Sequence, residues 1–182
     1  MKQASNGALV ALNLAAAHVT SAASSSPVLI TTGDTYPLPV FDRYRADGSA
    51  TVLVTRGHGV ARVLPTSLVG DATEALQTAL ADAKTGLDDL EVLVLPNLGR
   101  QAADRMFRLT EQHIGFSRTC WDWGRDVGHI GAGDQLAALA HLFETHRVHI
   151  GDRIALCGLG SGFTFGCAVL EITAEPDWSP SA

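Results

Sequence analysis

The chain has 182 residues, 46% of them hydrophobic and 18% charged, and its formal net charge at pH 7 is -6. This composition excludes a disordered chain, and the length suits one domain or slightly more around a large buried core. The negative charge disfavours non-specific binding to nucleic acid, although it is compatible with a local basic patch that receives a phosphorylated carrier.

The cysteines and an apolar run near the N-terminus bear on the cellular location of the protein. Cys120, Cys157 and Cys167 lack CxxC spacing, so we interpret them as reduced thiols of a cytoplasmic protein. Residues 8–19 are apolar but interrupted by polar side chains, and they fall short of the ~20 residues that span a bilayer. We therefore expect neither a membrane segment nor a signal peptide.

The first predicted element is a helix over residues 5–22, which are rich in Ala and Leu and contain no Pro. Apolar side chains occupy nearly every face of this helix, which is typical of a helix buried on all sides. Residues 28–32 then predict a strand that ends at Gly33 and Asp34. A continuous apolar strand after a buried helix indicates a sheet covered on both faces.

The elements that follow alternate between strands and helices. Residues 51–56 and 60–68 predict two strands joined as a hairpin at residues 57–59. Asp71 is a plausible N-cap of the next helix, with Glu74 at capping-box spacing. The other predicted elements are helices over 71–84, 99–112 and 131–145, strands over 92–95, 154–157 and 164–172, and irregular segments over 35–48 and 115–130. This alternation indicates a layered α/β fold.

Ser5 lies in the segment 3–7, which opens the first predicted helix. A nucleophile at a helix N-terminus meets the positive end of the helix dipole, and the oxyanion that it forms finds free backbone N–H groups there. Serine is also among the residues preferred as N-caps, and on this feature alone the cap is the simpler interpretation.

Asn97 and His129 stand in two further candidate segments. Asn97 follows a predicted strand, where open α/β sheets place their sites; on spacing alone, a turn residue or helix cap explains it better. His129 lies in the glycine-rich segment 128–135, where it could act as a base and where glycine lets a substrate approach closely. The alternative is a glycine loop with a structural histidine.

A last glycine-rich segment, residues 158–163, joins two predicted strands. It lacks the Lys-Ser/Thr pair of a P-loop and the GxGxxG fingerprint of dinucleotide-binding proteins. We therefore expect a tight turn that aims backbone N–H groups into a site. His141, His146 and His149 show no metal-ligand spacing, so we expect a solvent-facing surface there and no metal site.

Four segments occur in an informative order, namely those around Ser5, Pro96 and Gly128 and the final stretch 151–168. The final stretch begins with Gly-Asp and an apolar strand and continues as GLGSGFTFGCA. Together the segments resemble those of ketoacyl synthase III enzymes, which have the thiolase fold. The corresponding motifs of that family are A-C-A-G-F, V-P-H-Q-A-N, G-N-T-S-A-A-S and G-F-G-x-G-hydrophobic-T-W-G-x-A. The resemblance covers nearly the whole chain.

The resemblance implies an acyl-transfer chemistry. Such enzymes move an acyl group from a thioester to a catalytic Cys and then to an acceptor, usually malonyl-carrier protein. By position, Ser5 stands at the nucleophile site, Asn97 at the site of the family's His and His129 at the site of its Asn. The implied substrates are acyl-CoA or a phosphopantetheinyl carrier protein, without a tightly bound cofactor.

The resemblance also implies an oxyanion hole. The backbone N–H groups of Ser5 and Ser161 would form it, with Gly160 and Gly162 on either side of Ser161 in the glycine turn. We therefore expect Ser5 and the turn that contains Ser161 to lie within reach of one substrate atom.

Two departures from the family pattern concern the chemistry directly. A serine hydroxyl is a poor nucleophile without a base, and Asn97 cannot serve as one. His129 could take over as the base, with Asp134 to orient it. The sequence of residues 128–135 resembles that of a branch of the family from specialised metabolism. Some members of this branch move acyl groups onto oxygen or nitrogen.

Three hypotheses for the function follow. The first is an acyltransferase of fatty acid or polyketide metabolism that is acylated at Ser5. The second is a catalytically degenerate, non-enzymatic partner subunit or fragment of such a synthase. The third is a free-standing α/β binding domain. The retained His129 and the glycine turn favour the first hypothesis. The changes from Cys to Ser and from His to Asn favour the second hypothesis over carbon–carbon condensation.

The chain is short for the family. Family members carry a further block before the nucleophile, whereas Met1 lies only four residues before Ser5. We therefore expect an incomplete thiolase-like layered fold of the αβαβα type, mainly its C-terminal half. Residues 1–68 would be a remnant of the N-terminal half, residues 69–174 the C-terminal half and residues 175–182 a tail. A homo-oligomer, or a partner chain that supplies the missing half, is expected.

Overall fold

The computed structural model describes residues 4–21, 26–36, 45–160 and 162–177. Its helices are α1 (Gly7–Thr20), α2 (Ala72–Asp82), α3 (Arg100–Phe107), α4 (Trp121–Val127) and α5 (Asp134–Glu144), with short 3₁₀ helices η1 (Ala4–Asn6), η2 (Phe116–Arg118) and η3 (Gly131–Gly133). Its strands are β1 (Val28–Asp34), β2 (Gly48–Val54), β3 (Ala61–Val69), β4 (Leu90–Val94), β5 (Arg153–Gly160) and β6 (Thr164–Ile172).

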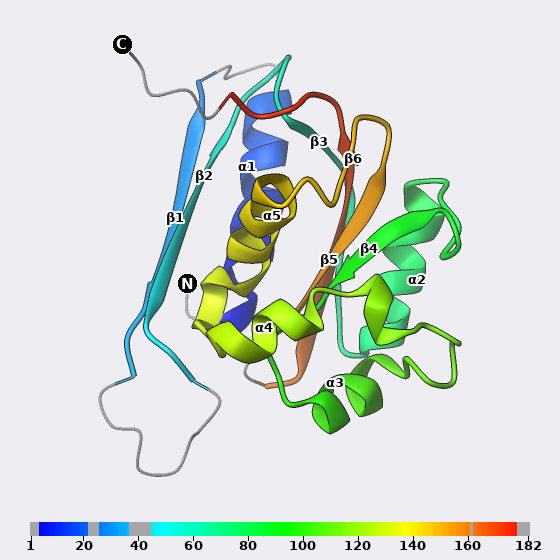
Figure 1. Cartoon of the computed structure of the whole chain (residues 1–182). Helices are drawn as coiled ribbons and strands as arrows, with labels where there is room; N and C mark the ends of the chain where they lie inside the picture. Colours follow the sequence, from blue (N-terminus) through cyan, green and yellow to red (C-terminus); the bar gives the residue numbers. More distant parts are fainter. Residues whose placement is uncertain (1–3, 22–25, 37–44, 161, 178–182) are drawn as a thin grey trace.

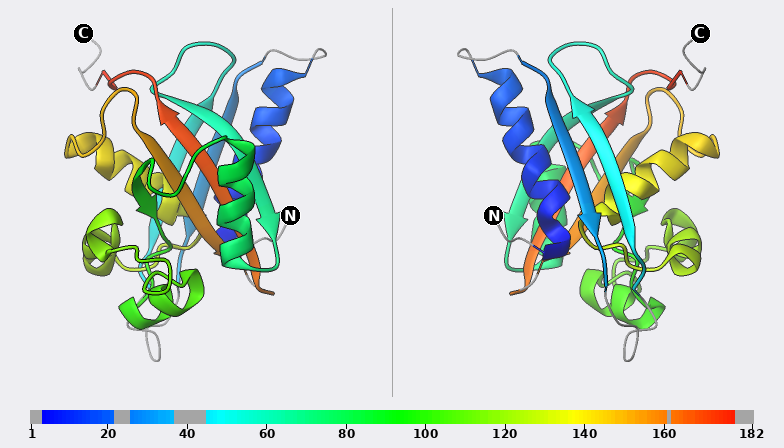
Figure 2. Two further views of the ribbon diagram at one scale, coloured as in Figure 1. Left: turned by 90° about the vertical axis from the view of Figure 1, so that its right-hand side faces the viewer. Right: turned by 90° about the vertical axis from the view of Figure 1, so that its left-hand side faces the viewer.

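These elements form successive layers (Figure 1). A two-stranded sheet of β1 and β2 lies on one side, α1 and α5 form the next layer, and a four-stranded sheet follows with the order β3-β6-β5-β4. Helix α2 covers the far face of the four-stranded sheet (Figure 2). The alternation of sheet and helix layers agrees with the layered α/β fold expected from the sequence.

The four-stranded sheet separates two hydrophobic cores, because successive side chains of a strand point to opposite faces. In β5, Ile154 and Leu156 pack into the core shared with α1 and α5, whereas Ala155 and Cys157 pack into the core shared with α2 and α3. Burial on both faces explains why β5 reads as an unbroken apolar run rather than an alternating one. The sheet is thus packed against helices on both faces.

Strands β5 and β6 form the hairpin predicted around the glycine turn, and their antiparallel pairing runs from Arg153↔Glu171 to Gly160↔Thr164. Strand β4 lies parallel to β5. The carboxyl ends of β4 and β5 therefore point to the same end of the molecule, which is where α/β sheets commonly place their sites.

Helix α1 differs from the expectation of a helix buried on all sides. Ala8, Leu9, Leu12, Ala15 and Val19 are buried against the core, whereas Leu14 is 57% exposed. The sequence of α1 is apolar nearly all round, but none of the described elements covers the outward face around Leu14.

Strands β1 and β2 pair with each other rather than with β3, so the hairpin predicted across residues 57–59 is wrong. Residues 57–59 carry the chain from the two-stranded sheet to the four-stranded sheet, where β3 pairs with β6. The expectation of a sheet covered on both faces also fails for β1. Leu29 and Leu53, which are paired across β1 and β2, are 64% and 59% exposed.

The predicted helix over residues 71–84 is confirmed as α2, and the Asp71 carboxylate accepts the expected capping bond from the Glu74 N–H at 3.0 Å. The helix expected over 99–112 is shorter than predicted, since α3 ends at Phe107. Arg108 adopts a left-handed conformation there. Asp104 stabilises this stop by accepting hydrogen bonds from the backbone N–H and the hydroxyl of Thr110.

The segment 115–130, expected to be irregular, contains η2 and the seven-residue helix α4. Within the described part of the chain, none of the helices is both long and apolar enough to cross a membrane. The boundaries proposed at residues 68 and 174 stay a prediction.

Candidate active site

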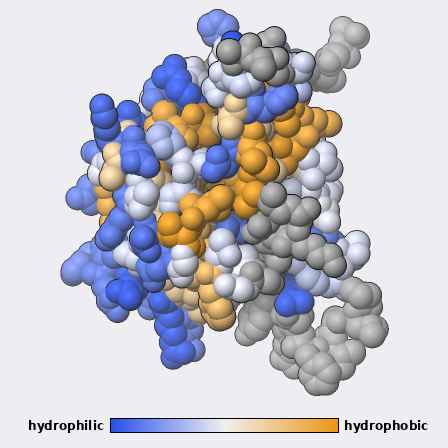
Figure 3. Space-filling view, turned by 180° about the vertical axis from the view of Figure 1, so that it is seen from behind, coloured by the Kyte–Doolittle hydropathy of each residue, from blue (hydrophilic) through white to orange (hydrophobic). Residues whose placement is uncertain are grey.

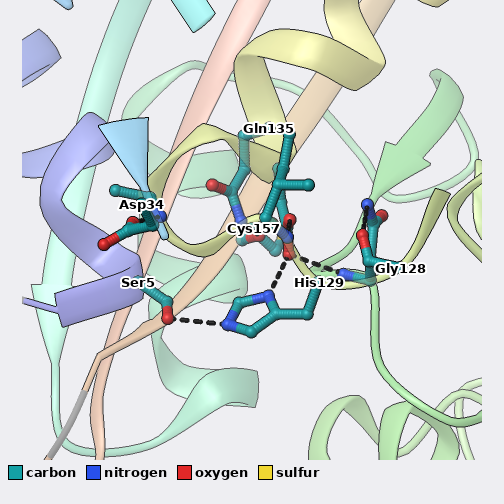
Figure 4. A network of polar contacts seen from close by, with 10 residues as sticks. Ser5, Asp34, Gly128, His129, Gln135 and Cys157 are labelled. Atoms are coloured by element: carbon teal, nitrogen blue, oxygen red, sulfur yellow. Dashed lines mark hydrogen bonds and ion pairs between the residues drawn. The ribbon is translucent and has the colours of Figure 1, made fainter. Parts of the chain in front are cut away.

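Three segments far apart in the sequence meet near the carboxyl ends of β4 and β5. Ser5 lies in η1, directly before α1. Asn97 follows β4, and His129 and Asp134 stand on either side of η3. Figure 4 shows Ser5 and His129 pointing toward each other within this cluster.

Ser5, His129 and Asp134 form a hydrogen-bonded row. The Ser5 Oγ lies 2.8 Å from the His129 Nε2, and the His129 Nδ1 lies 2.6 Å from the Asp134 Oδ2. A carboxylate accepts from an N–H, so the proton of neutral His129 belongs on Nδ1, and Nε2 is left to accept the Ser5 hydroxyl proton. This is the order nucleophile, base and orienting carboxylate.

Asp134 is fully buried, with a side-chain exposure of 0%, and its carboxylate is held by three N–H donors. Besides His129, the backbone N–H of Asn97 donates to Oδ2 and that of Ile130 donates to Oδ1, each at 2.8 Å. A buried carboxylate with this many donors keeps one orientation, since any rotation would break several bonds. Asp134 therefore fixes both the tautomer and the position of His129.

Asn97 supports the row through its backbone and its side chain. The Asn97 Nδ2 donates to the Gly128 carbonyl at 2.8 Å, so the amide holds the residue directly before His129. Gly124 of α4 packs closely against the Asn97 side chain, and a Cβ at that position would collide with the amide. The catalytic role that the resemblance implies for Asn97, at the site of the family's His, stays a prediction.

Asp34, at the end of β1, is a contributor that the sequence did not reveal. Its Oδ2 accepts a hydrogen bond from the Ala132 N–H at 2.8 Å. Gly131 has a φ of +70°, and a side chain at that position would clash with the Asp34 carboxylate. Asp34 thus anchors the glycine turn between His129 and Asp134, through a contact across 98 residues of sequence that no local pattern could indicate.

Asn6 packs behind Ser5, against the hairpin of β5 and β6. It is 0% exposed, and neither polar atom of its side chain has a hydrogen-bond partner in the described structure. A Cβ added at Gly158 would lie 2.5 Å from the Asn6 Oδ1, and one added at Gly166 would lie 2.9 Å from it. Glycine at both positions therefore lets the start of α1 approach the sheet closely.

The predicted oxyanion turn is described only in part. Gly160 ends β5 and pairs with Thr164, and Gly162 adopts a φ of +85° in the turn. Ser161, the second N–H donor that the resemblance implies, lies outside the described residues. The oxyanion hole of Ser5 and Ser161 stays a prediction.

None of the three cysteines has the surroundings of an activated nucleophile, and all are buried free thiols. Burial raises the pKa of the Cys120 thiol to about 11. The contact with Cys167 at 3.7 Å, together with burial, raises the pKa of Cys157 well above its ordinary value. A thiol with a raised pKa is a poor nucleophile at neutral pH, so the candidate nucleophile is Ser5.

Of the three histidines expected on a solvent-facing surface, His146 and His149 are exposed, whereas His141 is half-buried. His141 stacks on Trp123 with ring centroids 4.9 Å apart and an interplanar angle of 14°. In the described ranges, no group of three or more His, Cys, Asp or Glu side chains is placed to hold a metal ion.

Residues 80–172, just over half of the 182-residue chain, match the family model described as 3-oxoacyl-[acyl-carrier-protein (ACP)] synthase III C terminal. The chain therefore belongs to the 3-oxoacyl-[acyl-carrier-protein] synthase III family. Among curated proteins, none matches this chain in sequence.

Solved structures show the same fold over nearly the whole chain. The acyltransferase ChlB3 superposes with a TM-score of 0.87 at 24% sequence identity. The aligned region covers 97% of this chain and 68% of the ChlB3 chain. The synthase III FabH from Pseudomonas aeruginosa PAO1 superposes with a TM-score of 0.80 at 17% identity. The aligned region covers 97% of this chain and 67% of the FabH chain. A variant of OleA from Xanthomonas campestris, with bound lauric acid and lauroyl-CoA, superposes with a TM-score of 0.77 at 18% identity. The aligned region covers 94% of this chain and 65% of the OleA chain.

These likenesses confirm the thiolase-like α/β fold expected from the sequence. At sequence identities below 25%, these structures establish the fold and not the activity. The chain spans about two thirds of the length of each structure, so the activity and partners of the whole enzymes come to this chain only as proposals.

Proposed function

We propose that this chain carries the reactive centre of a synthase III-type acyltransferase, which accepts an acyl group on Ser5 from a CoA or carrier-protein thioester and passes it to an acceptor. The observation that carries the proposal is the hydrogen-bonded row of Ser5, His129 and Asp134. Family membership supports it, as does the lauroyl-CoA bound by the similar OleA variant.

The first half-reaction loads Ser5. As Oγ attacks the thioester carbonyl, the His129 Nε2 removes the hydroxyl proton, and the resulting imidazolium is stabilised by the Asp134 carboxylate. The carbon–sulfur bond then breaks, His129 returns the proton to the leaving sulfur, and the free thiol departs from the acyl ester of Ser5. Backbone N–H groups at the start of α1 would stabilise the transient oxyanion.

The second half-reaction favours an acceptor with an O–H or N–H proton. Carbon–carbon condensation in this family relies on a His and an Asn that stabilise the thioester oxyanion during decarboxylation. Here the Asn97 amide donates to the Gly128 carbonyl, and the His129 Nε2 faces Ser5. This arrangement supports general-base transfer to oxygen or nitrogen, as in pathways of specialised metabolism, over decarboxylative condensation.

The cellular setting follows from the same proposal. The acyl donor would be a carrier protein or CoA thioester of fatty acid or polyketide metabolism. A second copy or a partner chain would supply the part of the fold that the solved relatives contain and this chain does not. The three free thiols fit the proposed cytoplasmic location.

The direct test is acylation of the protein by acyl-CoA thioesters of several chain lengths, followed by intact-mass measurement and peptide mapping. We expect one acyl group on Ser5, none on Ser5→Ala, and loading slowed by about a hundredfold or more in His129→Ala, because the general base is then missing. Ser49→Ala, an exposed serine on β2, is the matched control and should load normally. Acylation that survives Ser5→Ala would refute the assignment of the nucleophile.

A further inference from the structure

His129 is partly exposed to solvent, whereas the Asp134 carboxylate behind it is fully buried. The side-chain exposure of His129 is 12%, and that of Asp134 is 0%. Since the acidic partner is buried and fully hydrogen-bonded, the row keeps its order while its outer end remains within reach of water.

The state of His129 after loading decides what the acyl ester of Ser5 can react with. Once the proton has left with the thiol, His129 is neutral again, with Nδ1–H still donating to Asp134 and Nε2 facing the acylated oxygen. A base in that position removes a proton from any hydroxyl that approaches the ester carbonyl. Water is the smallest such hydroxyl and needs no binding site of its own.

From this geometry we infer that the chain is also a serine hydrolase, which releases the acyl group of Ser5 to water when no acceptor is bound. In this step the water oxygen forms a bond to the acyl carbon and gives its proton to the His129 Nε2. The bond from the acyl carbon to the Ser5 Oγ then breaks, and Oγ takes the proton back. The products are a carboxylic acid and free Ser5, and the substrates are acyl thioesters and activated aryl esters.

The inference rests on the proposed function for its acyl-Ser5 intermediate, but it can be tested with reagents that need neither CoA nor a carrier. A fluorophosphonate reacts with a serine that a neighbouring base activates, and fluoride leaves as phosphorus bonds to Oγ. We expect one adduct, mapped to Ser5, with p-nitrophenyl acetate hydrolysed through many turnovers per molecule. Both activities should be absent in Ser5→Ala and unchanged in Ser49→Ala.

A second pair of variants separates chemistry from folding. Asp134→Asn keeps the side-chain shape but loses the carboxylate, and we expect hydrolysis to fall by about a hundredfold or more because His129 then loses its favoured tautomer. In His129→Ala, added imidazole should restore part of the hydrolysis, which a merely structural role for His129 would not permit.

The outcomes distinguish the two proposals. If acyl-CoA loads Ser5 but the ester persists for hours and no carboxylic acid appears, the hydrolase inference is overturned and the acyltransferase proposal stands. If aryl esters are hydrolysed and fluorophosphonate labels Ser5 while acyl-CoA does not load it, the hydrolase inference stands and the thioester proposal falls. If neither reagent modifies Ser5, both fall.

Discussion

The reactivity proposed for Ser5 depends on two side chains from a distant part of the sequence, His129 and Asp134. A serine hydroxyl is essentially protonated at neutral pH, so it needs a base within hydrogen-bond reach. His129 lies at that reach, 2.8 Å from Oγ, and Asp134 holds the ring from behind. In the proposed mechanism, a base aimed at Ser5 would compensate for the change from the family's thiol to a hydroxyl.

His141 provides a pH-dependent prediction. Burial lowers its pKa below the ordinary 6.5, although the nearby Glu144 opposes this shift. Between the folded pKa and about pH 6.5 the unfolded chain binds more protons than the folded one, so the free energy of unfolding falls as the pH is lowered through that window. We expect His141→Gln to show a smaller loss of Tm between about pH 7.5 and about pH 5 than the native chain.

The control for this prediction is His58→Gln, an exposed histidine between β2 and β3. Its Tm should follow the pH in the same way as that of the native chain. An unchanged pH slope in His141→Gln would show that the stack on Trp123 does not disfavour the charged imidazole.

At the residue scale, the sequence pointed to individual side chains better than to their contacts. Ser5 and His129 stood out through the helix start and the glycine-rich segment, and Asp134 through its short distance from His129 in the chain. The use of Asn97 to hold Gly128 was not foreseen, since a hydrogen bond across 31 residues leaves no local pattern. The roles of these residues in catalysis stay predictions.

At the element scale, the end of β1 and the glycine turn of η3 act as one unit, because the Asp34 carboxylate accepts from the Ala132 N–H. We expect Asp34→Ala to slow fluorophosphonate labelling of Ser5 about tenfold, since the turn that positions His129 loses its anchor. A lost hydrogen bond to a charged group corresponds to roughly 1.5–3 kcal/mol. Labelling rate and Tm, measured side by side, check this.

The matched variant is Asp34→Asn, whose amide oxygen can still accept from Ala132. It should label at nearly the native rate. If Asp34→Ala labels as fast as the native chain while its Tm falls, Asp34 stabilises β1 without positioning His129.

Element types were predictable where burial fixes them, and strand partners were not. The hairpin of β5 and β6 followed from two apolar runs around a glycine turn, and the cap of α2 followed from Asp71. The wrong hairpin between β2 and β3 arose because a short glycine link can join strands of different sheets as readily as strands of one sheet. The partner of β3 is β6, about a hundred residues further on, and no local signal specifies it.

On the scale of the whole molecule, an apolar surface stands out, which we call the α1–β1 face. It is formed by a groove between α1 and β1 that is lined by Ala11, Leu14, Ala15, His18, Val28, Leu29, Ile30 and Thr31. Figure 3 shows hydrophobic side chains gathered on the side where α1 lies. Leu14 and Leu29 are 57% and 64% exposed, and exposed apolar surfaces of this kind commonly mark protein–protein contacts.

We expect the purified chain to associate with a second copy of itself through the α1–β1 face. Replacing both Leu14 and Leu29 by Lys should lower the mean mass in sedimentation velocity and leave the Tm nearly unchanged, because both side chains are already exposed in the single chain. Ile150→Lys, at an exposed position distant in sequence from this face, should not alter association. A native chain that stays monomeric at every concentration would contradict this prediction.

The hydrogen bond between Ser5 and His129 spans 124 residues of sequence, and β3 must wait for β6 before it can pair. During translation, Ser5 leaves the ribosome long before the segments that carry His129 and Asp134. A nascent chain therefore exposes Ser5 without its hydrogen-bond partner, and only a chain synthesised as far as β6 can form both the β3–β6 pairing and the contact with His129. Such non-local closure slows folding. If Ser5 is the nucleophile that we propose, the order of synthesis would keep the growing polypeptide from reacting with cellular thioesters before the base is in place.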